Sequence, residues 1–152
     1  MVLGNLRNVY QPIDTGEKFH ESPEIGQADY FPFNHVPDLE LLTNEQDLSK
    51  AIFLFHSPPY KTYLDRAALD NVLIDHVPAD VHVGSIAIKE FIKKRKPYIT
   101  LHGHIHESSR ITGHWKQKLN KTWAFSAAYE KSQLAVVEFR LEEPEKAVRV
   151  II

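Results

Sequence analysis

Two short, continuous hydrophobic runs, each followed by histidine, are the clearest feature of the hydrophobic pattern. The first run, AIFLF, leads into His56, and the second, YITL, leads into His102. Apolar runs of this length without polar alternation are typical of strands that are buried on both faces. We therefore predict two short core strands, at residues 51–56 and 98–102.

The segment between these runs has the pattern of an amphipathic helix. Ala87, Ile88, Phe91 and Ile92 recur at helical spacing and define one apolar face. Ser85 is a good N-cap residue, and Pro97 cannot continue a helix, so we predict a helix over residues 85–96. The KKRK run at its end is favoured there by the helix dipole, which explains the run without a nucleic-acid partner.

The N-terminal third gives weaker signals. Residues 1–13 look like a strand or an extended arm, and residues 14–38 look like a long irregular connection interrupted by prolines. Thr43 and Gln46 form a capping-box pattern, which predicts a short helix over residues 43–50. Beyond the first core strand, residues 60–83 read as a loop, with one helical turn at residues 65–69.

The C-terminal third alternates as strands do. TWAFSA predicts one strand, QLAVVEFRL a second and AVRVII a third, and the turn EEPEK joins the last two. In the second, Ala135, Val137, Phe139 and Leu141 form the apolar set. In the third, we expect Val148, Val150 and Ile152 to face inward. These elements together predict an α/β (α+β) fold in a single domain over residues 1–152.

Composition narrows the chemistry of any site. The chain has 152 residues, a formal charge of −2 and no cysteine. The charge gives no reason to expect a nucleic-acid or membrane partner, and the lack of cysteine is compatible with a cytoplasmic location. No apolar run is long enough to span a bilayer. Any metal would have to be held by nitrogen and oxygen ligands.

Histidines follow both core strands, and this is the main functional signal. His56 ends the first strand, and Gly103-His104-Ile105-His106 leaves the second. If the two strands are parallel neighbours, joined by the helix, their carboxyl ends lie at one edge and these histidines converge. Neutral imidazole is a common metal ligand, so the pattern indicates a metal site. Gly103 would allow a tight turn or the close approach of a ligand.

FHSPPY followed by LHGHIHES resembles the C-terminal half of a calcineurin-like metallophosphoesterase of the bacterial and archaeal type. The resemblance covers residues 50–141 well. It implies part of an αββα two-sheet sandwich and a centre of two divalent metal ions (Mn, Fe or Zn) that hydrolyses a small phosphate mono- or diester. His56 and His104 would then bind the second metal, and His106 the first.

The family's N-terminal motifs do not occur ahead of His56 in this sequence. Before His56 there is no Asp-x-His, and Asp80-Val81-His82, which has that spacing, follows it; Gly-Asp-x-x-Asp and Gly-Asn-His-Asp are absent, and Gly4-Asn5 continues as Leu6-Arg7. The family's catalytic histidine is therefore absent from this chain. We expect a missing N-terminal half or a second chain to complete the site, and the isolated chain to dimerise, pair with that half or aggregate.

Four further residues near the motifs are candidates for supporting roles. We expect His102 to be a packed, hydrogen-bonded residue, and His82 to have either a structural role or a contact with substrate phosphate. Glu107 could orient a histidine ligand, and Arg110 could attract phosphate.

Two other interpretations remain open. One is a non-catalytic module that keeps the phosphoesterase sheet and binds a partner. The other is an unrelated histidine-rich metalloprotein such as a cupin, which would require an all-β barrel.

Overall fold

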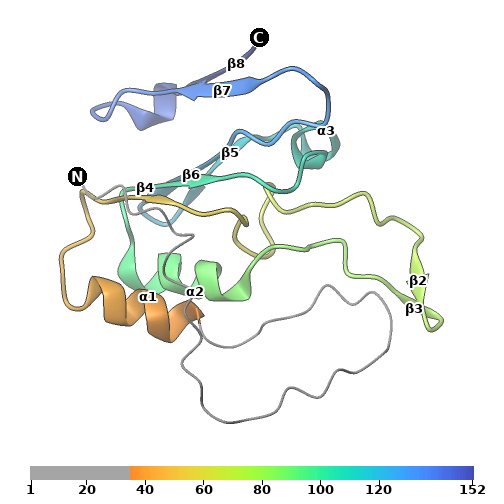
Figure 1. Cartoon of the computed structure of the whole chain (residues 1–152), viewed down its shortest axis with the longest axis horizontal. Coiled ribbons are helices and arrows are strands. Elements are labelled where there is room, and N and C mark those ends of the chain that lie inside the picture. Colours follow the sequence, from red (N-terminus) through yellow and green to blue (C-terminus); the bar gives the residue numbers. More distant parts are fainter. Residues whose placement is uncertain (1–34) are drawn as a thin grey trace. The chain divides into compact units, whose positions relative to one another are not determined.

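A mixed four-stranded sheet is the largest sheet of the described part of the chain (Figure 1). The computed structural model describes residues 35–152, and side chains from residue 39 onward. The sheet contains β1 (Ile52–Leu54), β4 (Ile99–His102), β6 (Thr122–Ser126) and β5 (Lys116–Leu119), in that order. β1, β4 and β6 run parallel, and β5 is antiparallel to β6. The described part of the chain therefore has a mixed α/β fold.

Helix α2 (Ile86–Arg95) connects β1 to β4, which confirms the predicted strand–helix–strand unit. The Ser85 side chain accepts a hydrogen bond from the Ile88 N–H at 3.2 Å, as an N-cap should. The helix ends at Lys96, which is left-handed (φ 51°) and donates its N–H to the Ile92 carbonyl. Pro97 follows directly, so the sequence signals at both helix ends are confirmed.

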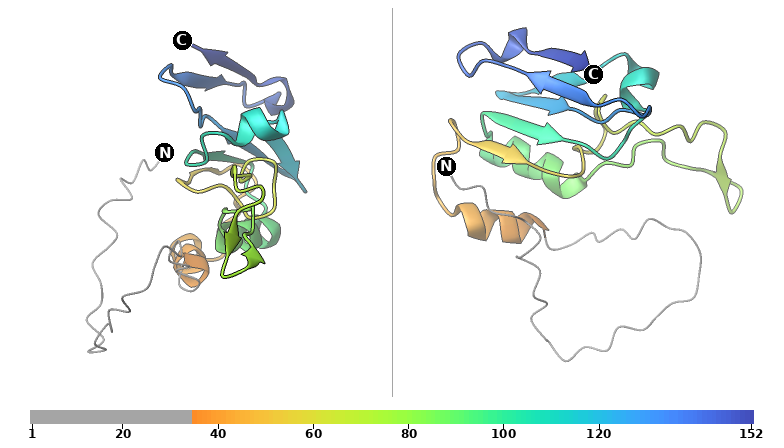
Figure 2. Two further views of the ribbon diagram at one scale, coloured as in Figure 1. Left: turned by 90° about the vertical axis from the view of Figure 1, so that its right-hand side faces the viewer. Right: turned by 45° about the horizontal axis from the view of Figure 1, so that its top comes forward.

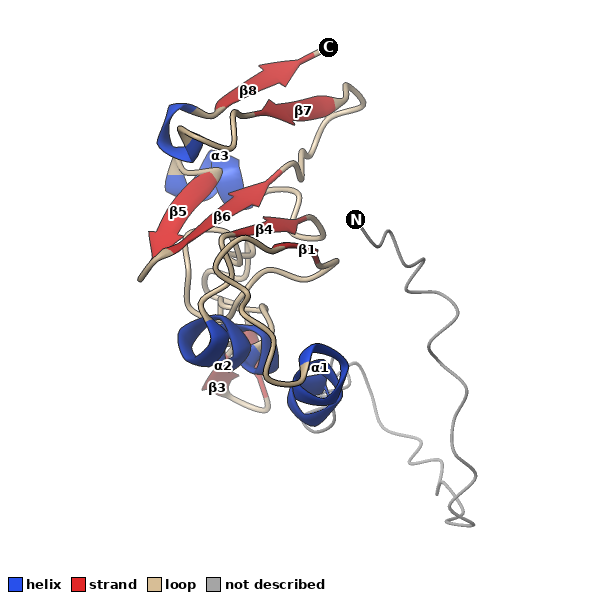
Figure 3. Ribbon diagram, turned by 90° about the vertical axis from the view of Figure 1, so that its left-hand side faces the viewer, coloured by secondary structure: helices blue, strands red, loops and turns tan. Residues whose placement is uncertain are grey.

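Two hydrophobic clusters cover the two faces of the sheet. On one face, Phe91 of α2 is fully buried and packs edge-on against Phe53 of β1, with 5.1 Å between ring centroids. On the other, Phe125 of β6 packs against Phe139, which follows β7 (Ala135–Glu138). Figures 2 and 3 show the resulting layers: the helices, the sheet, and the hairpin of β7 with β8 (Val148–Ile151).

The helix predicted over residues 43–50 is wrong, because Thr43 ends a helix and does not begin one. The helix is α1 (His35–Thr43), and the Thr43 hydroxyl donates back to the Leu39 carbonyl at 2.6 Å. Asn44 then adopts a left-handed conformation (φ 44°) and donates its N–H to the Glu40 carbonyl. The irregular connection predicted over residues 14–38 is wrong at residues 35–38, which belong to α1. The remainder of that connection, and the arm at residues 1–13, lie outside the described residues.

The region between β1 and α2 also differs from the prediction. No helical turn forms at residues 65–69, because the backbone groups of Asp65 and Ala67 bond instead to Val83 and Val81, in a short antiparallel bridge. A small hairpin of β2 (Leu73–Ile74) and β3 (Val77–Pro78) forms instead, and its strands are exposed.

The C-terminal strands were found by their alternation, but the inward face of the last one was predicted wrongly. Val148, Val150 and Ile152 are 50%, 39% and 68% exposed. Ala147 is buried in the cluster around Phe125, and Arg149, two residues on, is partly buried. A shift of one residue moves every side chain of a strand to the opposite face. The turn before β8 contains the 3-10 helix η2 (Pro144–Lys146).

Candidate metal centre

His56 and His104 face each other beyond the carboxyl ends of β1 and β4. Their ring centroids are 4.6 Å apart, and both residues are exposed. The loops that carry them are joined by a hydrogen bond of 3.0 Å from the Gly103 N–H to the His56 carbonyl. Because the two strands are parallel neighbours, the backbone itself brings the two imidazoles together at one edge of the sheet.

The tight turn at this edge falls on His104 and not on Gly103. His104 has a φ of 73°, a left-handed conformation that non-glycine residues adopt rarely. A Cβ atom added to Gly103 would meet only the His56 carbonyl oxygen, at an ordinary contact distance of 3.7 Å. The structure thus does not require glycine at position 103. The strained backbone belongs to one of the two facing histidines, as is common at functional sites.

His106 is the third predicted ligand, and it is exposed two residues further along the loop. Partial desolvation by the surrounding protein lowers the pKa of His104, and the neighbouring His56 and His106 lower it further. Within residues 35–152, no three histidine, aspartate or glutamate side chains converge into a metal-binding group. The described chain therefore brings together two of the three predicted ligands.

His102 is packed and hydrogen-bonded, as we expected. It is 4% exposed and stacks on Phe55. Its Nδ1 lies 3.0 Å from the Ser57 carbonyl, and its Nε2 lies 2.9 Å from the Thr100 hydroxyl. Since a carbonyl can only accept, Nδ1 carries the proton and Nε2 accepts from Thr100. Burial lowers the pKa of His102 to about 4, so the ring is neutral at neutral pH.

Glu107 and Arg110 bind to other parts of the protein. The Glu107 carboxylate accepts a hydrogen bond from the Ala68 N–H at 3.1 Å, which ties the histidine loop to the segment after β1. Arg110, in the short helix α3 (Ser108–Thr112), donates from Nε to the Glu130 carboxylate at 2.8 Å. Neither contact orients a histidine ring.

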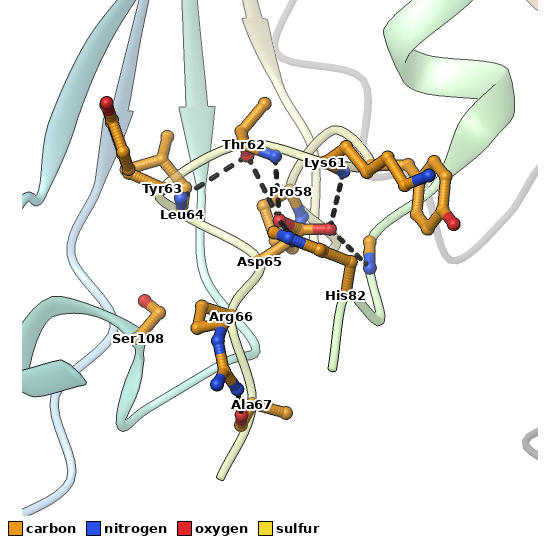
Figure 4. Close-up of polar contacts among 12 residues, drawn as sticks. Pro58, Lys61, Thr62, Tyr63, Leu64, Asp65, Arg66, Ala67, His82 and Ser108 are labelled. Carbon is orange, nitrogen blue, oxygen red and sulfur yellow. Dashed lines mark hydrogen bonds and ion pairs between the residues drawn. The ribbon is translucent and has the colours of Figure 1, made fainter. Parts of the chain in front are cut away.

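Asp65 is a buried carboxylate that the sequence analysis missed (Figure 4). Its Oδ1 accepts from the Thr62 N–H at 2.8 Å, and its Oδ2 accepts from the Lys61 and Gly84 N–H groups at 2.9 and 3.1 Å. His82 Nδ1 lies 2.8 Å from Oδ1, so the carboxylate fixes the orientation of that ring. The spacing of Thr62 and Asp65, a Thr-x-x-Asp pattern, was the available signal.

The Asp65 cluster holds the loop that follows His56 against the start of α2. The Pro58 carbonyl accepts the Ser85 N–H at 2.8 Å. A Cβ atom at Gly84 would lie 2.7 Å from both Asp65 Cβ and the Pro58 carbonyl oxygen, so only glycine fits at this position. Through these contacts Asp65 sets the path of the chain just beyond His56. His82 is bound into this cluster and lies beside the Tyr60 ring.

Comparisons of the chain with models of protein families, with curated proteins and with solved structures gave no match. Over the described residues, no helix has the length and apolar character needed to cross a membrane.

Proposed function

We propose that this chain is part of a metal-dependent phosphoesterase of the calcineurin-like type, acting on small phosphate mono- or diesters. The observation that carries the proposal is the pair His56 and His104, which face each other from the ends of two adjacent parallel strands. Each belongs to a motif that resembles this family, and the two motifs are distant in the sequence.

The residues at this edge fit a divalent metal ion. Two exposed imidazoles with 4.6 Å between ring centroids can turn a nitrogen each towards a common ion. Imidazole ligands suit Fe or Zn, and Mn would need further oxygen ligands beside them. The chemistry that such ions would supply when bound is Lewis acidity, which lowers the pKa of a coordinated water and offsets phosphate charge. His102 would not bind, because both of its ring nitrogens already have partners.

We further propose that another segment or chain completes the αββα sandwich and supplies the remaining ligands. Two observations support this. β1 is an edge strand of the described sheet, so one side of its backbone is unpaired there. Its side chains Ile52 and Leu54 are 44% and 63% exposed, as expected for a strand that another sheet strand or layer would cover.

The cupin interpretation does not agree with the fold. A cupin is an all-β barrel, whereas β1, α2 and β4 form a parallel strand–helix–strand unit. The non-catalytic module keeps the same sheet, so only activity separates it from the enzyme.

The metal site can be tested by changing imidazole to amide. His56→Asn and His104→Asn should each weaken Mn²⁺ or Zn²⁺ binding by about tenfold or more, because each removes a nitrogen ligand. Asparagine tolerates the left-handed backbone at position 104, so the fold should persist. The measurement is isothermal titration calorimetry.

His76→Asn is the matched control, since His76 is also an exposed, left-handed histidine but lies in the β2–β3 turn. Equal losses in all three variants would contradict the proposed site. Mn²⁺-dependent hydrolysis of a chromogenic phosphodiester, with the N-terminal half supplied, then tests catalysis. No activity in that complete assembly would favour the non-catalytic module.

A further inference from the structure

A second feature, a positively charged pocket of about 320 Å³, lies beside His106. Its lining includes Arg110 of α3, Glu130 and Lys131 in the segment after β6, and Arg149 of β8. Three cations face one carboxylate there, whereas the chain as a whole carries a net charge of −2. The pocket is therefore a local excess of positive charge, next to one of the predicted metal ligands.

Arg149 is the central residue of this pocket. Its Nη1 donates to the Ser109 hydroxyl at 2.8 Å, and its Nη2 donates to the Ala128 carbonyl. Both acceptors are neutral, and neither Arg149 nor Lys131 forms an ion pair within residues 35–152. A partly buried guanidinium without a carboxylate partner is costly unless an anion compensates for it.

One of the buried, unsatisfied polar atoms of the described chain belongs to Arg149 itself. Two buried side-chain atoms have no hydrogen-bond partner among residues 35–152, and they are Arg149 Nε and Ser108 Oγ. Ser108 does not line the pocket, so only the Arg149 atom bears on it. The Arg149 Nε–H is thus a buried donor that no described residue accepts.

Two aromatic side chains form part of the pocket wall. Trp115 and Tyr129 also line it, and the Arg149 guanidinium lies 5.3 Å from the centre of the Tyr129 ring. A guanidinium held over an aromatic ring still presents its N–H edge to an oxyanion. Of the remaining cations, Arg110 is already paired with Glu130, which leaves Arg149 and Lys131 for a ligand.

We propose that this pocket binds a second anionic group of the substrate, one that is not cleaved. The substrate would then be a phosphoester that carries a further phosphate or carboxylate, with His106 between the pocket and the reacting phosphate. This inference rests on the proposed phosphoesterase function. It narrows the substrate class from phosphoesters in general to those with two negative groups.

The first experiment measures anion binding without metal, so that it does not depend on catalysis. Inorganic phosphate and phenyl phosphate are titrated into the chain in the presence of EDTA, and backbone and arginine Nε–H shifts are followed by NMR. Shifts should cluster at α3 and at Arg149. Arg149→Gln should raise the Kd about tenfold, since charge-assisted hydrogen bonds are lost, and Lys131→Gln should raise it about threefold.

Lys121→Gln is the matched control, because Lys121 is exposed at the β5–β6 turn and does not line the pocket. Lys131 is exposed as well, so its variant should fold even where Arg149→Gln does not. Phosphate binding that Lys121→Gln weakens as much as the two pocket variants would overturn the proposal. Shifts that cluster away from α3 and β8 would also overturn it.

The second experiment compares substrates in the completed, Mn²⁺-loaded assembly. Phenyl phosphate, carboxyphenyl phosphate and phenylene bisphosphate differ in the group that would enter the pocket, so they also separate a carboxylate from a phosphate. Arg149→Gln should lower kcat/KM about tenfold for the doubly charged substrates only. If Arg149→Gln lowered kcat/KM equally for all three substrates, the pocket would not be a binding site for the second anionic group. If anions bound without metal but no substrate were hydrolysed, only the proposed phosphoesterase function would be wrong.

Discussion

Replacing Asp65 with alanine is expected to destabilise the protein by about 3–5 kcal/mol. The carboxylate is fully buried and accepts the N–H groups of Lys61, Thr62 and Gly84. Its removal leaves these donors, which are buried or part-buried, without their acceptor, at a cost of about 1–3 kcal/mol for each that water does not reach. Since small domains are stable by only about 5–15 kcal/mol, the loss should be evident in chemical denaturation followed by circular dichroism.

Two glycine variants provide the matched comparison. Gly84→Ala places a methyl group 2.7 Å from Asp65 Cβ and the Pro58 carbonyl oxygen, so it should disrupt the same cluster and destabilise by about 2 kcal/mol or more. Gly103→Ala meets only an ordinary contact, and its effect should stay within about 1 kcal/mol. If the two variants were equally stable, the Asp65 cluster would not hold the loop after His56 in the way described.

The elements that sequence alone predicted are those whose local and tertiary signals agree. Helix α2 has a capping serine, an apolar face and a terminating proline, and Ile88, Phe91 and Ile92 are buried as that face requires. β1 and β4 are shorter than the predicted strands at residues 51–56 and 98–102, but their places are right. No second pattern competes in these segments, so the local preference for helix or strand and the tertiary packing favour the same secondary structure.

The failures arise where two local patterns compete. Thr43 fits an N-cap by its spacing to Gln46, yet its hydroxyl binds backward to Leu39, because the preceding segment is helical. In β8 the alternation of valines predicted the wrong inward face, since Ala147 and Arg149 take the core side. Alternation defines two faces of a strand, but only the tertiary contacts decide which of them is buried.

The sequence predicted that the histidines of the site would converge, but it did not predict their backbone conformation or the residues that support them. The facing of His56 and His104 follows from two parallel strand ends, which the strand–helix–strand pattern already indicated. The left-handed conformation of His104 and the buried acceptor Asp65 depend on hydrogen bonds between distant segments. The pocket at Arg149 unites α3 with β8 across about forty residues, so no local pattern could have indicated it.

Acid should destabilise the metal-free protein, and His102 should account for about 3 kcal/mol of this loss. Burial lowers the pKa of His102 to about 4, against 6.5 for an ordinary histidine, so the unfolded chain takes up the proton more readily. The contribution to stability is therefore complete above pH 6.5 and is lost as the pH falls towards 4. Urea denaturation at a series of pH values in EDTA measures this slope.

His102→Asn is the control, because its amide can still donate to the Ser57 carbonyl but cannot titrate. This variant is expected to be less stable than the wild type at neutral pH, and the difference between the two should shrink by about 3 kcal/mol between pH 6.5 and 4. Imidazole ¹⁵N NMR of the wild type gives an independent reading, with Nδ1 protonated and Nε2 free of a proton at pH 6. A His102 resonance that titrates near pH 6.5, or a stability difference that does not change with pH, would show that the ring is not held neutral by its burial.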